Sequence, residues 1–267
     1  LWALAALYFI LKYLDSKSVK YLVFSSLCFF GALLSKETTV TFIAIIPLTI
    51  YFFSNHSVKK NIMSAAPLVL AFVIYLGIRY AFLGAPKMEP IKELMNDPFI
   101  HATSSQKFGT IFYTLGLYIR LLFFPHPLTH DYYPWHPIAN DSYKWGGGIF
   151  PYIDLADPRA LLPLLFYFGI FIYALIGIKK KSIFYYGILF FLGTFILTSN
   201  LIFPIGTFMN ERFMYIPSIG FCLILSYLLV EKLPLRIKNS FTFKKVFLLI
   251  AIIILGAFSF KTISRNY

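Results

Sequence analysis

Long apolar stretches separated by short polar segments dominate this sequence. A helix needs roughly 20 apolar residues to cross a hydrocarbon core about 30 Å thick. Eight stretches are candidate membrane spans: 1–14, 21–34, 38–53, 62–83, 160–178, 182–203, 213–230 and 246–260. A ninth apolar stretch, 108–124, contains Arg120 and is followed by Pro125 and Pro127. The pattern predicts an all-α fold, a polytopic membrane helical bundle of about eight spans.

The composition agrees with a membrane protein. Of the 267 residues, 59% are apolar, 20% are aromatic and only 13% are charged, and the charged share is about half that of a soluble domain. The two cysteines, Cys28 and Cys222, lie inside apolar stretches and do not indicate a redox compartment. This composition excludes a disordered segment, a nucleic-acid-binding arm and a disulfide scaffold. We expect residues 1–267 to form a single membrane domain.

The formal net charge of +13 is unevenly distributed along the chain. Connections 12–20, 54–61, 179–181 and 231–245 hold thirteen of the 24 Lys and Arg residues but only two of the eleven acids. By the positive-inside rule these connections are cytoplasmic, and segment 84–159 is then a large outer loop. The alternation requires stretch 108–124 to be re-entrant or interfacial. The alternative is that 108–124 crosses the membrane and the 179–181 lysines lie outside.

Ser35-Lys36-Glu37 lies between two short candidate spans of 14 and 16 residues, about 21 and 24 Å of helix at 1.5 Å per residue. Both are shorter than the hydrocarbon core, so we expect the turn between them to lie below the outer interface. Ionisable groups at that depth generally line a protein-enclosed cavity, and the start of the following helix favours an anion. The alternative is that Lys36 and Glu37 pair with each other at a shallow hairpin tip.

Asn210-Glu211-Arg212 is a second charged turn on the same side of the predicted membrane. Arginine is suited to bidentate contact with phosphate, so Arg212 is a candidate phosphate-binding residue. The alternative is that Arg212 and Glu211 form a salt bridge that orients the turn. We expect two such turns on one face to share a cavity. Arg79 and Arg120 either extend their side chains to the membrane interface or line the same cavity.

The outer loop contains a third polar cluster, in the sequence His130-Asp131-Tyr132-Tyr133. A carboxylate, a base and aromatic faces together are typical of sugar handling; the alternative is an interfacial aromatic belt. The sequence has no phosphate-binding loop, no nucleotide-binding glycine motif and no zinc motif. We therefore expect no cofactor, no metal, no nucleic-acid partner and no ATP-driven activity.

Several of these motifs carry a family resemblance. Residues 33–37 (LLSKE), 122–133 (LLFFPHPLTHDY), 204–222 and 261–267 resemble the membrane portion of the transmembrane-and-tetratricopeptide-repeat O-mannosyltransferases and their bacterial relatives. The resemblance implies a GT-C type glycosyltransferase that takes a sugar, mannose in the named family, from a polyprenyl-phosphate carrier. It also implies a soluble repeat domain after residue 267. The family's catalytic acid lies in a first outer loop that these residues do not include, so we expect an N-terminally truncated chain.

The resemblance also implies roles for the charged turns. Lys36 and Arg212 would bind the donor phosphate. The base on the acceptor hydroxyl would lie in the missing first outer loop, with Glu37 or Asp131 as the candidates within this chain. Supporting roles would fall to Ser35, Glu211, His130, Tyr132 and Tyr133.

The partners implied are a polyprenyl-phosphate-linked sugar, an exported protein acceptor with Ser or Thr hydroxyls, and membrane lipid. The expected location is the bacterial inner membrane with the active site facing the periplasm, or alternatively the endoplasmic reticulum membrane with a lumenal site. Two other functions are open, and the first of them would use the same charged residues to line a translocation path. They are a flippase or transporter of lipid-linked sugar, and a non-catalytic membrane anchor for a repeat scaffold.

Overall fold

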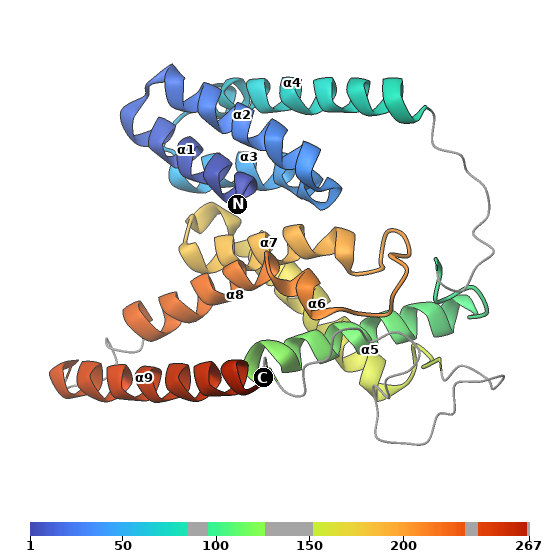
Figure 1. The fold of residues 1–267 in the computed structure, drawn as a ribbon. Helices are drawn as coiled ribbons and strands as arrows, with labels where there is room; N and C mark the ends of the chain where they lie inside the picture. The colour runs from blue at the N-terminus through green and yellow to red at the C-terminus, as the bar shows by residue number, and fades with distance from the viewer. Residues whose placement is uncertain (85–95, 126–151, 233–239, 266–267) are drawn as a thin grey trace.

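The computed structural model describes residues 1–84, 96–125, 152–232 and 240–265, which form a bundle of helices (Figure 1). The α-helices are α1 (Trp2–Ser16), α2 (Val19–Ser35), α3 (Phe42–Phe53), α4 (Val58–Leu83), α5 (Ser104–Phe123), α6 (Pro158–Gly177), α7 (Ile183–Phe195), α8 (Pro217–Ser226) and α9 (Ser240–Arg265). Short 3₁₀ turns include η1 (Glu37–Thr41), η2 (Ile178–Lys180), η3 (Ile196–Thr198) and η4 (Glu211–Met214), and a π-turn, η5 (Tyr227–Lys232), follows α8. These residue ranges contain no strand, which confirms the all-α prediction for them.

Two of the described helices are long and apolar enough to cross a membrane, judged by length and composition. They run over Lys59–Leu83 (25 residues) and Pro158–Lys180 (23 residues). The apolar helices Val19–Ser35, Glu37–Phe53 and Ile183–Thr198 have 10 to 17 residues each, or at most about 26 Å of helix. The expected count of about eight full spans is therefore not supported by the helix lengths.

Candidate span 182–203 is shorter than predicted for a local reason. Its helix ends in the turn η3, and Asn200 follows with a positive φ of 62°. A left-handed residue stops a right-handed helix, and Asn is one of the few side chains that tolerates this conformation. The apolar residues after Asn200 therefore form a loop rather than the end of a span.

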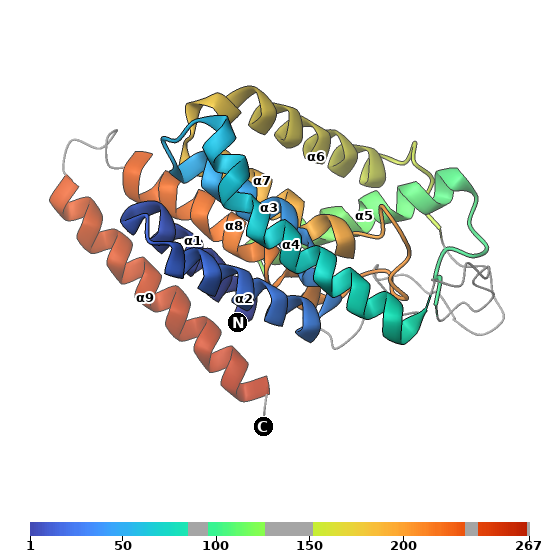
Figure 2. The same ribbon diagram turned by 90° about the horizontal axis from the view of Figure 1, so that it is seen from above.

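Packing divides the core into two clusters that share α7. The first cluster contains residues of α1, α2, α3 and α4 together with Tyr186 and Phe190 of α7. The second contains residues of α5, α6 and loops together with Phe191 and Phe195 of α7. Helix α3 packs on α7, and α7 packs closely on α8. In both views α9 runs along the outer edge of the bundle (Figures 1 and 2).

The close packing of α7 on α8 depends on two glycines. A Cβ at Gly187 would lie 2.9 Å from the carbonyl oxygen of Gly220, and a Cβ at Gly220 would lie 2.5 Å from that of Gly187. Small residues at a helix crossing let the backbones approach each other, as in membrane helix pairs. The two glycines thus let α7 and α8 pack backbone against backbone.

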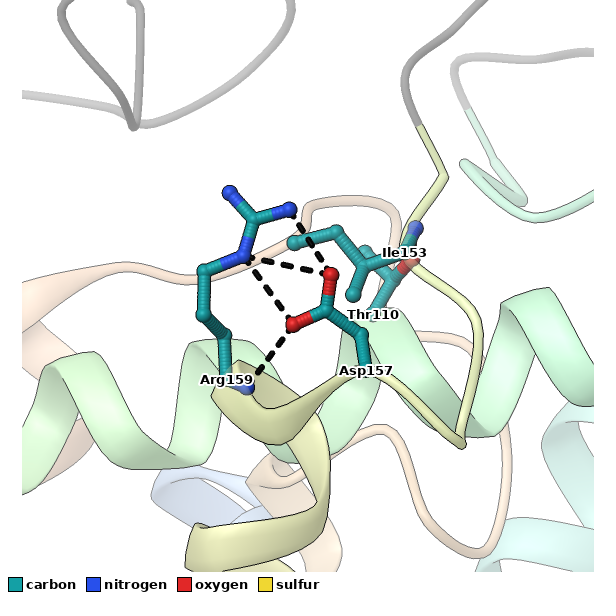
Figure 3. Close-up of polar contacts among 4 residues, drawn as sticks. All are labelled: Thr110, Ile153, Asp157 and Arg159. Carbon is teal, nitrogen blue, oxygen red and sulfur yellow. Dashed lines mark hydrogen bonds and ion pairs between the residues drawn. The ribbon is translucent and has the colours of Figure 1, made fainter.

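Stretch 108–124 corresponds to the later part of α5 and its C-cap Phe124; α5 is a 20-residue helix that begins with a Thr103–Gln106 capping box. Figure 3 shows the segment that leads into α6: the Ile153 amide donates to Thr110 Oγ1 of α5 at 3.0 Å. Asp157 caps α6 by accepting from the Arg159 amide at 2.8 Å, and its carboxylate also pairs with the Arg159 guanidinium at 2.8 Å. The segment before α6 is thus tied to α5. The re-entrant or interfacial placement of 108–124 stays a prediction.

Candidate functional site

A cavity of about 750 Å³ lies where the turn after α2, the C-terminal half of α4 and the loop before α8 meet. Its lining is mostly apolar, and its charged residues lie in two turns and, for Arg79, on α4. The lining residues are Lys36, Glu37, Thr38, Val40, Phe72, Tyr75, Leu76, Arg79, Asn96, Leu197, Thr198, Phe203, Pro204, Ile205, Gly206, Arg212 and Phe213.

The first charged wall of the cavity is the turn between α2 and α3. Helix α2 ends at Ser35, Lys36 adopts an extended conformation, and Glu37 opens η1. The Thr39 amide and hydroxyl both donate to the Lys36 carbonyl, at 3.1 and 2.6 Å. The Ser35 hydroxyl donates to the Gly31 carbonyl at 2.8 Å. The backbone is thus held by local bonds, which leaves the Lys36 and Glu37 side chains to face the cavity.

The second wall comes from α4, which brings Arg79 beside Glu37. The Arg79 Nη1 atom lies 3.2 Å from Glu37 Oε2 and also donates to the Tyr75 hydroxyl at 3.3 Å. The Arg79 and Glu37 side chains are 47% and 69% exposed. An exposed ion pair adds little to stability, so its main consequence is the position of both side chains. Glu37 therefore pairs with Arg79, rather than with Lys36 as the hairpin-tip alternative supposed.

The third wall is the loop that precedes α8, and Asn200 holds it in place. The Asn200 side chain is 2% exposed. Its amide donates to the carbonyls of Thr207 and Phe208 at 3.0 and 3.1 Å, and its Oδ1 accepts from the Ile205 amide at 2.9 Å. Three bonds from one buried side chain thus close the 200–208 segment into a compact loop at the cavity wall.

Arg212 follows this loop and is positioned by Asn210 and Tyr118. Asn210 Oδ1 accepts from the Arg212 amide at 3.1 Å, which caps η4. The buried Tyr118 hydroxyl of α5 accepts from the Asn210 amide at 2.7 Å and donates to the Asn210 carbonyl at 3.1 Å. The Arg212 guanidinium lies 5.3 Å from the Phe213 ring centre. A buried network therefore fixes the backbone beneath an exposed guanidinium.

The charge of the cavity is predominantly positive. Its lining holds three cations, Lys36, Arg79 and Arg212, and one carboxylate, Glu37. Within the ranges that the structure covers, no group of three or more His, Cys, Asp or Glu side chains could hold a metal ion. The lining is thus suited to binding an anion through side-chain donors.

A second, smaller groove adjoins the charged turn. It has a volume of about 430 Å³ and shares Lys36, Glu37, Tyr75 and Arg79 with the main cavity. The rest of its lining is Leu33, Leu34, Ser35, Ile78, Phe82 and Leu83, and Leu34, Phe82 and Leu83 are 57%, 85% and 70% exposed. Exposed apolar side chains in a row are typical of a surface that faces lipid or an apolar ligand. The groove thus joins an apolar surface to the cations.

The structure brings together three of the sequence-predicted site residues. Lys36, Glu37 and Arg212 line one cavity, Ser35 lines the adjoining groove, and Glu211 precedes Arg212 in η4. The other four, His130, Asp131, Tyr132 and Tyr133, lie outside the described residues. The chemical roles of all of them stay predictions.

Three residues of this region were left undecided or missed by the sequence reasoning. Arg79 was visible as a cation inside an apolar span, but no sequence signal showed that it meets Glu37. Asn200 and Tyr118 are ordinary residues in a sequence, and only their buried hydrogen bonds identify them as positioning residues. The one sequence hint for Asn200 was its position as a polar residue near the end of the apolar stretch 182–203.

Comparisons with known proteins give partial similarity to one group. The chain is 31% identical over 129 residues to human protein O-mannosyl-transferase TMTC3, which is 46% of this chain and 13% of the human protein. It is 36% identical over 87 residues to the Caenorhabditis elegans protein O-mannosyl-transferase F38B6.6, and 33% identical over 72 residues to Drosophila melanogaster protein O-mannosyl-transferase Tmtc2. These matches span 32% and 27% of this chain, and 12% and 7% of those relatives.

The similarity therefore covers less than half of this chain and a small part of each relative. No family model matches the chain, and no solved structure matches it.

Proposed function

We propose that this chain is the membrane portion of a glycosyltransferase that moves a sugar from a polyprenyl-phosphate donor to a hydroxyl acceptor, a Ser or Thr of an exported protein. The observation that carries the proposal is the convergence of Lys36, Arg79 and Arg212 on one cavity, with an apolar groove beside it. A lipid phosphate combines the two chemistries that these surfaces offer. The named activity of the similar proteins, protein O-mannosyl transfer, supports the same class of reaction.

The cations would act on the phosphate. The acceptor oxygen forms a bond to the anomeric carbon from the face opposite the phosphate, while the bond from that carbon to the phosphate oxygen breaks with inversion. The leaving phosphate keeps the electron pair, so its negative charge grows in the transition state. Cations that are already in place favour this charge more than they favour the ground state. Arg212 and Arg79 suit bidentate contacts, and Lys36 supplies a point charge.

The acceptor hydroxyl must lose its proton to a base. Glu37 and Asp131 are the candidates within this chain, and the family resemblance places a further acid in a first outer loop that precedes these residues. Glu37 is held by Arg79 at 3.2 Å, so its carboxylate has a defined position in the cavity wall. A lipid-phosphate donor contains no nucleotide, and the cations of the chain therefore supply the charge that a metal supplies to nucleotide donors.

The proposed setting is a GT-C-like bundle of about eight spans with the cavity on the extracytoplasmic side. In this scheme the shorter helices cross as part of the protein interior together with their flanking 3₁₀ turns, as over Glu37–Phe53 and Ile183–Thr198. The basic connections 12–20, 54–61 and 179–181 lie together at the other end of the bundle, which this scheme places on the cytoplasmic side. The membrane is the bacterial inner membrane, with the endoplasmic reticulum as the alternative.

The experiment compares Arg212→Ala with a matched control in the full-length natural protein. Arg212→Ala should abolish sugar transfer from a polyprenyl-phosphate sugar to an acceptor protein while leaving membrane insertion intact. Arg159→Ala removes an arginine that pairs with Asp157 outside the cavity lining, and it should retain transfer. Near-normal transfer by Arg212→Ala would overturn the proposal.

A further inference from the structure

A separate groove lies at the opposite ends of α3 and α4 from the charged cavity. It has a volume of about 460 Å³ and is lined by Pro47, Tyr51, Asn61, Ile62, Ala65, Ala66 and Val69. Ile62 is 66% exposed and Val69 is 47% exposed, so the groove lies open along the outer face of α4. None of the lining residues carries a charge, and most are apolar. The surface is therefore suited to an apolar chain.

The polar end of this groove has its acceptors occupied. The Ser54 side chain is buried and donates through Oγ to Asn61 Oδ1 at 2.8 Å. Lys181 reaches across from the turn before α7 and donates through Nζ to the Ser54 carbonyl at 2.6 Å. Its ammonium also lies 5.1 Å from the centre of the Tyr51 ring. Both the amide oxygen and the carbonyl are thus bonded within the protein.

The polar end of the groove also has hydrogen-bond donors that are not used within the described parts of the chain. Among the parts of the chain that the structure covers, neither the Asn61 amide nitrogen nor the Tyr51 hydroxyl donates to another residue. The Lys181 ammonium has three N–H donors, of which one is directed to Ser54. A ligand that bonds to these donors supplies acceptors, and the adjacent Lys181 charge favours an anion.

More positive charge surrounds the same end of the bundle. Lys59 and Lys60 lie in the first turn of α4. The pKa of His56 is lowered by partial desolvation and by the positive charges of Lys60 and Lys17, so the α1–α2 and α3–α4 connections lie close together. Three of the four predicted cytoplasmic connections, 12–20, 54–61 and 179–181, thus converge at the polar end of the groove.

We propose that this groove binds an anionic phospholipid. One acyl chain lies along Ile62, Ala66 and Val69, and the phosphate accepts hydrogen bonds from Tyr51, Asn61 and Lys181. A soluble anion would use the polar end alone, whereas a lipid uses both the donors and the apolar groove that continues from them. The inference depends on the chain lying in a membrane and is independent of sugar transfer.

Native mass spectrometry of the detergent-purified full-length protein tests the proposal. The probes are phosphatidylglycerol and phosphatidylcholine with the same acyl chains. The wild type should retain phosphatidylglycerol about tenfold more strongly than phosphatidylcholine, because both lipids carry the phosphate but phosphatidylcholine adds a trimethylammonium cation that Lys181 repels. Lys181→Gln should remove most of this preference, because it removes the charge at the polar end. Lys179→Gln, which changes a lysine of the same connection, should leave the preference unchanged.

A second variant tests the apolar half and does not touch the buried bonds. Ala66 is exposed on α4, so Ala66→Phe fills the groove without entering the core. It should lower the retention of both lipids. The matched control Val73→Phe lies two turns further along the same face and outside the groove lining, and it should lower neither.

Three results would overturn the proposal. The first is equal retention of the two lipids by the wild type. The second is an equal effect of Lys179→Gln and Lys181→Gln, which would indicate diffuse surface charge. The third is displacement of phosphatidylglycerol by millimolar inorganic phosphate, which would indicate a site for soluble anions.

Discussion

Asn200 provides the sharpest test of how the cavity wall is built. Its side chain is buried, donates to two carbonyls and accepts from one amide, and its backbone has a φ of 62°. Asn200→Ala removes all three side-chain bonds and leaves a Cβ at positive φ. Asn200→Gly removes the same bonds and relieves the backbone of that Cβ.

The size of the effect follows from these contacts. A buried hydrogen bond contributes about 1 kcal/mol to the free energy of unfolding, so three bonds contribute about 3 kcal/mol. Left-handed backbone adds a cost of about 1 kcal/mol for alanine. We therefore expect Asn200→Ala to lower the free energy of unfolding by about 4 kcal/mol and Asn200→Gly by about 3 kcal/mol.

The assay is equilibrium unfolding of the full-length protein in mixed micelles, followed by circular dichroism. Asn55→Ala is the matched control, because Asn55 is exposed in the connection between α3 and α4, and it should change the free energy by less than about 0.5 kcal/mol. The Asn200 variants should also lose sugar transfer under conditions in which they remain folded, because the loop leads to Arg212. An Asn200→Ala protein within about 0.5 kcal/mol of the wild type would refute the assigned role.

Three further predictions concern other parts of the molecule. Arg79→Gln should lower sugar transfer about a hundredfold without shifting the unfolding midpoint, because its ion pair with Glu37 is exposed; a shifted midpoint with unchanged transfer would contradict this. The sequence contains two glycosylation sequons, Asn55-His56-Ser57 and Asn140-Asp141-Ser142. In microsomes only Asn140 should be glycosylated, because the charge pattern predicts that 54–61 is cytoplasmic; modification of Asn55 would invert the topology. The hydrogen bonds from Arg159 lower the pKa of Asp157. The ionised Asp157 therefore stabilises the fold at neutral pH, and this contribution is lost below about pH 4 as the carboxylate is protonated. Asp157→Asn should reduce that acid dependence in unfolding measurements, and an unchanged pH profile would argue against the pair.

Hydropathy located the helices well but not their ends. The predicted stretch 38–53 corresponds to η1 and α3, because a long apolar run has few alternatives to helix. Helix α4 begins at Val58 rather than at residue 62, since Lys59 and Lys60 continue the helix with their side chains directed to solvent. The apolar residues after Asn200 were assigned to a span, although they form the loop that Asn200 holds.

The candidate site was predictable in part for a similar reason. Lys36, Glu37 and Arg212 are conspicuous because charge is rare in an apolar sequence. The two turns that carry them line one cavity. The Glu37–Arg79 pair joins residues of different helices, and its formation depends on how α4 packs against α2. Local sequence contains no information on that packing. The roles of His130, Asp131, Tyr132 and Tyr133 stay predictions.

The chemical identity of the donor tests the central claim most directly. The measurement is sugar transfer to an acceptor protein by the purified full-length protein, with either a polyprenyl-phosphate sugar or the matching nucleoside-diphosphate sugar as the only donor. The cations Lys36, Arg79 and Arg212 beside an apolar groove predict transfer from the lipid-phosphate donor and none from the nucleotide donor. Transfer from the nucleotide sugar alone would contradict the account.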